Sequence, residues 1–263
     1  MNLGLEDKVA LVCGSSRGLG RAVADELAAE GASVAVCARD PAALERAADE
    51  IGRTTGAAVL AVPADLAVPG EPTRVVEACR ERFGRLDVLV TNTGGPPAGT
   101  HDTLSLEDWD RATALLLRST VELAAGALPE MKSRGWGRIL AVTSVAAKQP
   151  VDNLMLSNSL RAAVTGFAAT LAREVATDGI TVNTILPGYT ATERVTELNE
   201  ANARREGVEP AEVQARLEAE IPLGRLAEPR EFAALAAFLV SERAAYITGG
   251  AFAVDGGWLR GLC

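Results

Sequence analysis

The chain has 263 residues, of which 48% are hydrophobic and 23% are charged. These proportions are close to globular averages and argue against a disordered chain. The chain carries 26 Lys and Arg residues against 35 Asp and Glu residues, a formal net charge of -9, which argues against a general nucleic-acid-binding or membrane-surface protein.

Short apolar runs alternate with longer helical patterns along the chain. The runs predict buried strands at residues 9–13, 33–38, 58–62, 86–91, 138–143 and 181–186. The helical patterns lie at 17–30, 41–55, 71–83, 106–133 and 153–177, with a last helix at 229–240 and a last strand at 251–254. Such alternation is typical of right-handed βαβ units and a parallel sheet. We therefore expect one α/β domain over residues 1–263, a Rossmann-type doubly wound parallel sheet of about seven strands with helices on both faces.

One segment, residues 190–222, interrupts this alternation because it is polar and rich in charge. Long insertions after the carboxyl end of a strand often cover the site in such sheets. Residues 211–220 contain good helix formers, so a solvated helical excursion is a second interpretation. The two are compatible, and we expect a lid-like insertion here.

The sequence has little that indicates metal binding, disulfides or a membrane. It has one histidine, which excludes a site with several histidine ligands, and we expect no metal. Its cysteines form no CxxC pair and are expected to be free thiols; they are Cys13, Cys37, Cys79 and Cys263. No apolar run reaches the roughly 18–20 residues of a membrane helix. Glu6 and Asp7 lie where a signal peptide would be basic and then apolar, so we expect a cytoplasmic protein.

A glycine-rich turn follows the first predicted strand. It reads Gly14-Ser15-Ser16-Arg17-Gly18-Leu19-Gly20 and leads into the first predicted helix. Glycines allow a tight turn and close approach of the backbone to a pyrophosphate, and the helix N-terminus supplies N–H donors. The spacing is GxxxGxG and not the common GxGxxG. Its position between the first strand and the first helix nevertheless predicts a dinucleotide site.

The residues after the second predicted strand bear on the choice of cofactor. NAD sites place a carboxylate there for the ribose 2′-hydroxyl, whereas NADP sites need a cation for the 2′-phosphate. Here Ala38 offers no carboxylate, and Arg39 and Arg17 offer two cations. Asp40 remains a possible NAD ligand, so we expect NADP(H), with NAD(H) less favoured. Asp65, after the third strand, either binds the adenine or caps a turn.

These features resemble the short-chain dehydrogenase/reductase family over nearly the whole chain, and most of all the bacterial 3-oxoacyl-carrier-protein reductases. Residues 91–94 are similar to the family's NNAG stretch, and residues 187–192 are similar to its PGxxxT segment, which frames the nicotinamide. Residues 221–225 and 254–257 resemble its C-terminal signature. The resemblance implies that the cofactor is held by Gly14, Ser16, Arg17, Gly18, Leu19, Gly20, Arg39, Asp65, Leu66, Asn92, Gly94, Pro187, Gly188 and Thr192.

The resemblance also places a catalytic site. The family uses Asn, Ser, Tyr and Lys, the last two four residues apart on one helix face. In this sequence Ser144 matches the serine, Ser157 and Arg161 match the tyrosine and lysine, and Leu116 matches the asparagine. We predict Ser144, Ser157 and Arg161 as catalytic-site residues. A serine hydroxyl is a much weaker acid than tyrosine, and arginine keeps its proton to high pH, so the proton needs another source.

Three other sources of the proton, and three functions, follow from this pattern. Tyr189 lies beside the PG pair and His101 lies in the loop after the fourth strand; packing and solvent exposure are the alternative interpretations, and water is the third source. We expect an NADP(H)-dependent oxidoreductase acting on a carbonyl or alcohol with a non-standard proton donor. The main alternative is a catalytically silent nucleotide-binding homologue, a sensor or a hetero-oligomer partner. Dehydration or isomerisation is less favoured.

The expected partners are a small-molecule carbonyl or alcohol substrate, no nucleic acid and no membrane. The resemblance implies a homo-oligomer, a dimer or a tetramer, formed in part by the helices near 106–133 and 153–177. The second of these helices carries a stripe of apolar and small residues, which fits either the core or a subunit contact. The stripe comprises Val164, Phe167, Ala168, Leu171 and Val175.

Overall fold

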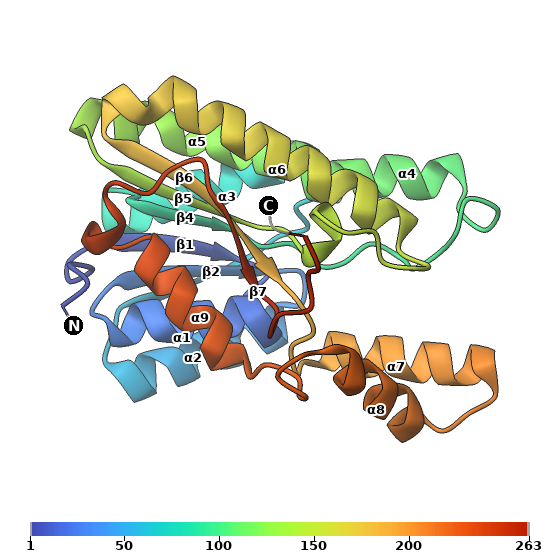
Figure 1. Ribbon diagram of the computed structural model, residues 1–263. Helices are drawn as coiled ribbons and strands as arrows, with labels where there is room; N and C mark the ends of the chain where they lie inside the picture. Colours follow the sequence, from blue (N-terminus) through green and yellow to red (C-terminus); the bar gives the residue numbers. More distant parts are fainter. Residues whose placement is uncertain (1, 262–263) are drawn as a thin grey trace.

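The structure is a computed structural model and describes residues 2–261. Its centre is a seven-stranded sheet of order β3-β2-β1-β4-β5-β6-β7 in which every neighbouring pair is parallel. The strands are β1 (Val9–Cys13), β2 (Ser33–Ala38), β3 (Val59–Pro63), β4 (Val88–Thr91), β5 (Gly137–Val142), β6 (Ile180–Pro187) and β7 (Ala251–Val254). The expected Rossmann-type doubly wound sheet is confirmed (Figure 1).

Helices cover both faces of the sheet. The α-helices are α1 (Gly18–Ala29), α2 (Pro41–Thr55), α3 (Glu71–Phe83), α4 (Leu106–Thr113), α5 (Ser119–Arg134), α6 (Met155–Val175), α7 (Glu193–Glu206), α8 (Pro210–Glu220) and α9 (Pro229–Leu239). Helices α3, α5 and α6 pack on one face, and α1, α2 and α9 pack on the other (Figure 1). Because both faces are covered, the strands are apolar at nearly every position instead of alternating with polar residues.

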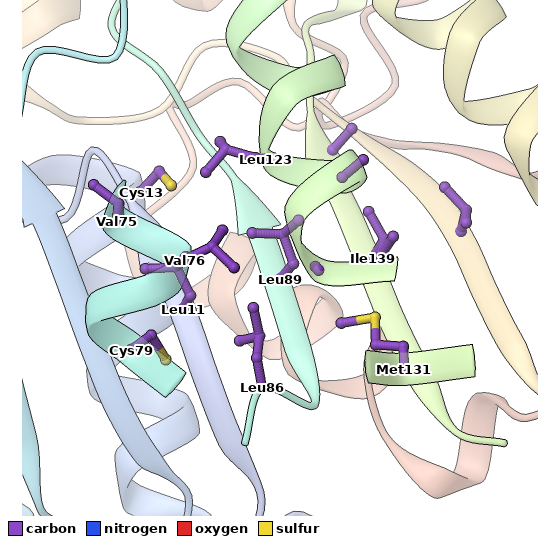
Figure 2. Close-up of a cluster of buried hydrophobic side chains, with 14 of the residues drawn as sticks. Leu11, Cys13, Val75, Val76, Cys79, Leu86, Leu89, Leu123, Met131 and Ile139 are labelled. Carbon is purple, nitrogen blue, oxygen red and sulfur yellow. The ribbon is translucent and has the colours of Figure 1, made fainter. Parts of the chain in front are cut away.

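The core has one layer on each face, since successive strand residues point to opposite sides. Leu11, Leu89 and Ile139 meet α3 and α5 on the first face (Figure 2), whereas Val12 and Val90 face α1, α2 and α9.

The three cysteines that the structure describes are buried and carry free thiols, as expected. They are Cys13, Cys37 and Cys79. Burial raises the pKa of the Cys79 thiol to about 12, so this thiol stays protonated at neutral pH. Cys263 lies outside the described residues.

The apolar stripe of α6 faces the chain's own sheet. Val164, Ala168, Leu171 and Val175 are buried in the core cluster on that face, and Phe167 packs against it. The stripe is therefore explained by internal packing, and it gives no argument for a subunit contact. The dimer or tetramer stays a prediction.

The predicted helix 106–133 is divided in the structure. A π-helical segment, Ala114–Arg118, separates α4 from α5. The wider turn leaves carbonyl groups to be satisfied, and hydroxyls do so: Ser119 Oγ donates to Leu115 O, and Thr120 Oγ1 donates to Leu116 O at 2.8 Å. Such bulges occur often at functional sites. The other predicted elements agree with the structure to within about two residues at each end.

Residues 190–222 contain the two helices α7 and α8, which extend beyond the carboxyl ends of the strands (Figure 1). The helix expected at 211–220 is α8. A parallel bridge between Thr190 and Ala227 closes the base of the insertion. No helix within residues 2–261 is long and apolar enough to cross a bilayer.

Candidate active site

The glycine turn and the end of β4 converge at the point where the strand order reverses. This point lies between β1 and β4, the place where open α/β sheets bind ligands. Asn92 Nδ2 donates to Gly14 O at 3.2 Å and ties β4 to the turn. Gly14 has a φ of 60°, which favours glycine. A Cβ on Gly20 would lie 2.2 Å from Gly14 O, so only glycine lets α1 begin this close to the strand.

Arg39 is the cation that the sequence predicts after β2, and in the described structure no acidic side chain neutralises it. Arg39 is exposed and has no ion pair among residues 2–261. Asp40, the alternative NAD ligand, is the N-cap of α2 and accepts from the N–H groups of Ala42 and Ala43 at 3.0 and 3.2 Å. Because the Asp40 carboxylate already caps α2, the local geometry favours a cofactor with a ribose 2′-phosphate over one with a 2′-hydroxyl.

The start of the lid-like segment lies against the glycine turn. A Cβ on Gly18 would lie 3.6 Å from Thr192 Cγ2. Arg17 is exposed, and its Nη2 lies 3.6 Å from Glu197 Oε1 on α7. Thr192 and Arg17, two of the predicted cofactor residues, are therefore on neighbouring segments although they are far apart in the sequence.

The remaining predicted cofactor residues occupy the same edge of the sheet with less distinctive contacts. Asp65 accepts from Ala67 N at 3.0 Å, so it caps its own turn and the adenine contact stays a prediction. Gly188 donates to Val254 O at 2.9 Å, and a Cβ on it would lie 2.8 Å from Asp255 Cα. The others are Ser16, half-buried in the turn; Leu19, half-buried on α1; Leu66, buried in the core; Gly94, exposed after β4; and Pro187, half-buried at the end of β6.

Helix α6 places two of the predicted catalytic-site residues one turn apart. Arg161 is only 8% exposed, and its Nη1 donates to Val142 O at 2.8 Å. Burial lowers its pKa to about 10, and Arg194 contributes in the same direction. Ser157 is half-buried and has no hydrogen bond from its side chain among the described residues. Ser144 lies after β5, and its Oγ accepts from Ala146 N at 3.1 Å. The contact with Val142 holds Arg161 against the strand that leads to Ser144.

Leu116 makes the wall beside α6 apolar. It lies in the π-helical segment and is buried in a cluster with Leu156 and Leu160. Its carbonyl accepts from the Thr120 hydroxyl. The Leu116 side chain has no polar atom that could bind a water or pass on a proton.

The two alternative proton donors have different surroundings. Tyr189 packs edge-to-face on Trp258, with ring centroids 5.7 Å apart. Burial raises the pKa of Tyr189, and the carboxylates of Glu220 and Asp152 raise it further, so its phenol is a weaker acid than usual. His101 is exposed in a turn after β4. The geometry favours neither as the direct donor.

Sequence reasoning missed two side chains at this edge of the sheet. Trp258 follows the Gly256-Gly257 pair, and Arg194 is the second residue of α7. Arg194 Nη2 donates to Pro96 O at 3.0 Å in the loop after β4. Nothing in the charge-rich 190–222 segment distinguishes Arg194 from its neighbours before the fold is known.

Comparisons with known proteins agree on one family. The profile of the enoyl-(acyl carrier protein) reductase family matches residues 14–259. The chain is 35% identical to 3-oxoacyl-[acyl-carrier-protein] reductase FabG of Vibrio cholerae over 255 residues, 97% of this chain and 98% of the relative. It is 33% identical to D-beta-hydroxybutyrate dehydrogenase of Rhizobium meliloti over 254 residues, 95% of this chain and 98% of the relative.

A solved structure agrees as well. L-sorbose reductase from Gluconobacter frateurii, complexed with NADPH and L-sorbose, superposes with a TM-score of 0.95 and 37% identity over 100% of both chains. This protein is similar to that reductase along its whole length. The chain belongs to the short-chain dehydrogenase/reductase family, close to the 3-oxoacyl-carrier-protein reductases.

Proposed function

We propose that the protein is an NADP(H)-dependent oxidoreductase that transfers a hydride between nicotinamide and a carbonyl or alcohol substrate, with a proton donor other than tyrosine. The observation that carries the proposal is the arrangement of the predicted cofactor residues: the glycine turn, Asn92 against Gly14, and an Arg39 that has no ion pair among residues 2–261, beside an Asp40 that already caps a helix. Relatives solved with NADPH support the same choice of cofactor.

The residues of the cofactor edge fit a dinucleotide phosphate. The start of α1 would present backbone N–H groups to the pyrophosphate, and Gly14 and Gly20 allow the turn, Asn92 and the start of the helix to pack closely together. Arg17 and Arg39 supply the positive charge for the 2′-phosphate, with Arg17 first leaving its pairing with Glu197. When bound, the cofactor supplies the hydride from its nicotinamide ring.

The substrate oxygen needs stabilisation and a proton. The Ser144 hydroxyl donates to the carbonyl oxygen, and the Arg161 guanidinium stabilises the negative charge that develops there, an interaction that is strong in a buried site. General acid catalysis is worth about 10²–10⁴-fold, while alignment of the reactants is worth about 7–11 kcal/mol. Hydride transfer therefore survives without the tyrosine, and water delivers the proton to the alkoxide.

The second candidate function is a catalytically silent nucleotide-binding protein. It is favoured by the leucine cluster around Leu116, which puts apolar side chains where the family has its asparagine, and by the raised pKa of Tyr189. This candidate predicts NADPH binding without turnover on any carbonyl. The proposed oxidoreductase, in contrast, predicts both NADPH binding and turnover of a carbonyl substrate.

Replacing Arg39 with alanine tests the cofactor edge. We expect the Kd for NADPH to rise about 10- to 100-fold and the Kd for NADH to stay within about twofold, because a charge-assisted bond to phosphate contributes about 1.5–3 kcal/mol. Titration of both nucleotides by nicotinamide fluorescence measures this. Arg53→Ala, an exposed arginine on the same helix as the Asp40 cap, is the control and leaves both constants unchanged. Equal weakening of NADPH and NADH would contradict the assignment.

A further inference from the structure

One ion pair joins the lid-like insertion, residues 190–222, to the glycine turn. Arg17 Nη2 of the turn lies 3.6 Å from Glu197 Oε1 on α7. Within residues 2–261 this is the only ion pair between the insertion and the rest of the chain, because the other ion pairs of the insertion join two of its own residues. The carboxylate of Glu197 therefore connects the insertion to the turn that is proposed to hold the cofactor.

Helix α7 borders a cavity on the side that faces α1. The cavity has a volume of about 570 Å³. Arg21 and Asp25 line it from α1, and Thr196 and Asn199 line it from α7. Because this side of α7 faces open space instead of a packed core, the ion pair of Glu197 with the glycine turn bears directly on how α7 is held there.

The glycine turn is bonded to the end of β2, so Arg17 and Arg39 start from neighbouring segments. Ser15 N donates to Cys37 O at 3.1 Å, and Cys37 N donates to Ser15 Oγ at 3.0 Å. Arg17 follows shortly after Ser15, Arg39 follows shortly after Cys37, and both arginines are exposed. A 2′-phosphate held by the two arginines, as proposed above, must therefore compete with Glu197 for Arg17.

Glu197 has a second cation to which it can turn. Arg194 Nη1 lies 3.9 Å from Glu197 Oε2 on the same helix, at the i,i+3 spacing that lets side chains meet. Arg194 Nη2 donates to Pro96 O at 3.0 Å, which keeps this guanidinium in place. Glu197 thus keeps a positive neighbour when Arg17 leaves. An exposed ion pair is weak, whereas a phosphate makes strong charge-assisted hydrogen bonds to arginine, so the phosphate takes Arg17.

We infer that Glu197 competes with the cofactor's 2′-phosphate for Arg17, so that NADPH detaches α7 from the glycine turn and NADH does not. The inference rests on the proposed function, in which Arg17 binds the 2′-phosphate. NADH carries a neutral 2′-hydroxyl at that position, which does not replace a carboxylate as the partner of a guanidinium. Glu197 is therefore a positioning residue that acts through Arg17, and it makes the insertion respond to the phosphate that distinguishes the two cofactors.

Dissociation constants of four proteins test the competition. The unchanged protein, Glu197→Gln, Arg17→Gln and the double variant are titrated with NADPH and with NADH at low ionic strength, followed by nicotinamide fluorescence. We expect Glu197→Gln to lower the Kd for NADPH about two- to fivefold, the range for an exposed ion pair, and to leave the Kd for NADH unchanged. In the Arg17→Gln background the same change should lose its effect on NADPH, because the contested partner is gone.

Glu200→Gln is the matched control for these titrations. Glu200 lies on the same helix, and its ion pair is with Arg204, also on α7, at 3.8 Å. This variant removes the same charge from α7 without touching the pair with Arg17. It is expected to leave the constants for NADPH and NADH unchanged.

Hydrogen exchange of the α7 amides gives a second readout that does not depend on affinity. Both complexes are measured at saturating cofactor. We expect the amides of α7 to exchange about two- to fivefold faster in the NADPH complex than in the NADH complex, since an exposed ion pair that holds the helix is lost only with NADPH. Glu197→Gln should remove this difference between the complexes.

Three results would overturn the inference. A higher Kd for NADPH in Glu197→Gln would show that Glu197 holds Arg17 in place for the phosphate, and an unchanged Kd would show that the pair is inert. A difference in α7 exchange between the two complexes that persists in Glu197→Gln would show that another contact carries it. In each case binding of NADPH still upholds the proposed function, whereas a protein that does not bind NADPH would contradict the proposed function itself.

Discussion

Substituting Gly20 with alanine is expected to abolish NADPH binding, with a Kd at least about 100-fold higher, and to lower the free energy of unfolding by about 1–3 kcal/mol. The added Cβ would lie 2.2 Å from Gly14 O and 2.6 Å from Asn92 Nδ2. Neither neighbour can give way cheaply, since one is backbone and the other is hydrogen-bonded to it. The start of α1 must move away from β1, and the N–H groups that face the phosphates move with it.

Gly52→Ala on α2 is the matched control, because its new Cβ would meet its nearest neighbour at an ordinary 3.6 Å. It is expected to leave NADPH binding unchanged and to raise stability by about 0.5–1 kcal/mol, the usual gain for alanine inside a helix. Fluorescence titration and urea denaturation measure both effects. Unchanged NADPH affinity in Gly20→Ala would show that the turn does not hold the cofactor.

Replacing Arg161 with methionine is expected to stabilise the protein without cofactor and to impair its reaction. Buried, poorly compensated charges often destabilise relative to apolar residues of similar volume, by about 1–4 kcal/mol. Loss of the hydrogen bond to Val142 O costs about 1 kcal/mol, so a net gain of up to about 3 kcal/mol in the free energy of unfolding is expected. The kcat/KM for carbonyl reduction falls about 10²- to 10³-fold, the effect of removing one group that stabilises an oxyanion.

The stability difference between Arg161→Met and the unchanged protein is expected to depend on pH. The pKa of Arg161 in the folded protein is about 10, below its ordinary value of 12.5. The unfolded chain therefore binds more protons between these values, and the penalty for burying the charge is present below pH 10 and is relieved as the pH rises through that window. The stability advantage of Arg161→Met should accordingly shrink above pH 10.

Arg138→Met is the comparison that separates the effect of an uncompensated charge from the effect of replacing any buried arginine. Arg138 is also buried, but it donates to the carbonyls of Ser241, Gly137 and Gly179 and lies 4.3 Å from the Trp136 ring centroid. Its replacement is expected to destabilise the fold by about 1–3 kcal/mol, because several carbonyls lose a donor. If Arg161→Met destabilises as much as Arg138→Met, the charge of Arg161 is well compensated and its proposed role is wrong.

The sequence was sufficient for the fold because its signals are local. Strands such as 33–38 are apolar runs between helical patterns, and the glycine turn directly follows the first strand and leads into the first helix. The π-helical segment within 106–133 was not predictable, since Leu116 and its neighbours continue a helical pattern and the bulge depends on how α4 and α6 pack.

The candidate site was predictable only in its cofactor half. Arg39 and the glycine turn adjoin strands in sequence, so their positions follow from the fold. The use of Asp40 and Asp65 as caps depends on local backbone geometry. The packing of Tyr189 on Trp258 joins residues that are far apart in the sequence, so it depends on the tertiary structure. The contact of Arg194 with Pro96, between α7 and the loop after β4, likewise needed the tertiary structure.

The most direct test of the proposed function follows the hydride itself. The protein is incubated with NADPH deuterated at the transferable position of the nicotinamide and with a panel of oxo acids, their amides and neutral ketones, and the alcohols are analysed by mass spectrometry. We predict one deuterium on the carbinol carbon of at least one product, with one NADPH consumed for each alcohol formed. Tight NADPH binding with no deuterium in any product and no NADPH consumed would contradict the oxidoreductase and favour the silent nucleotide-binding protein.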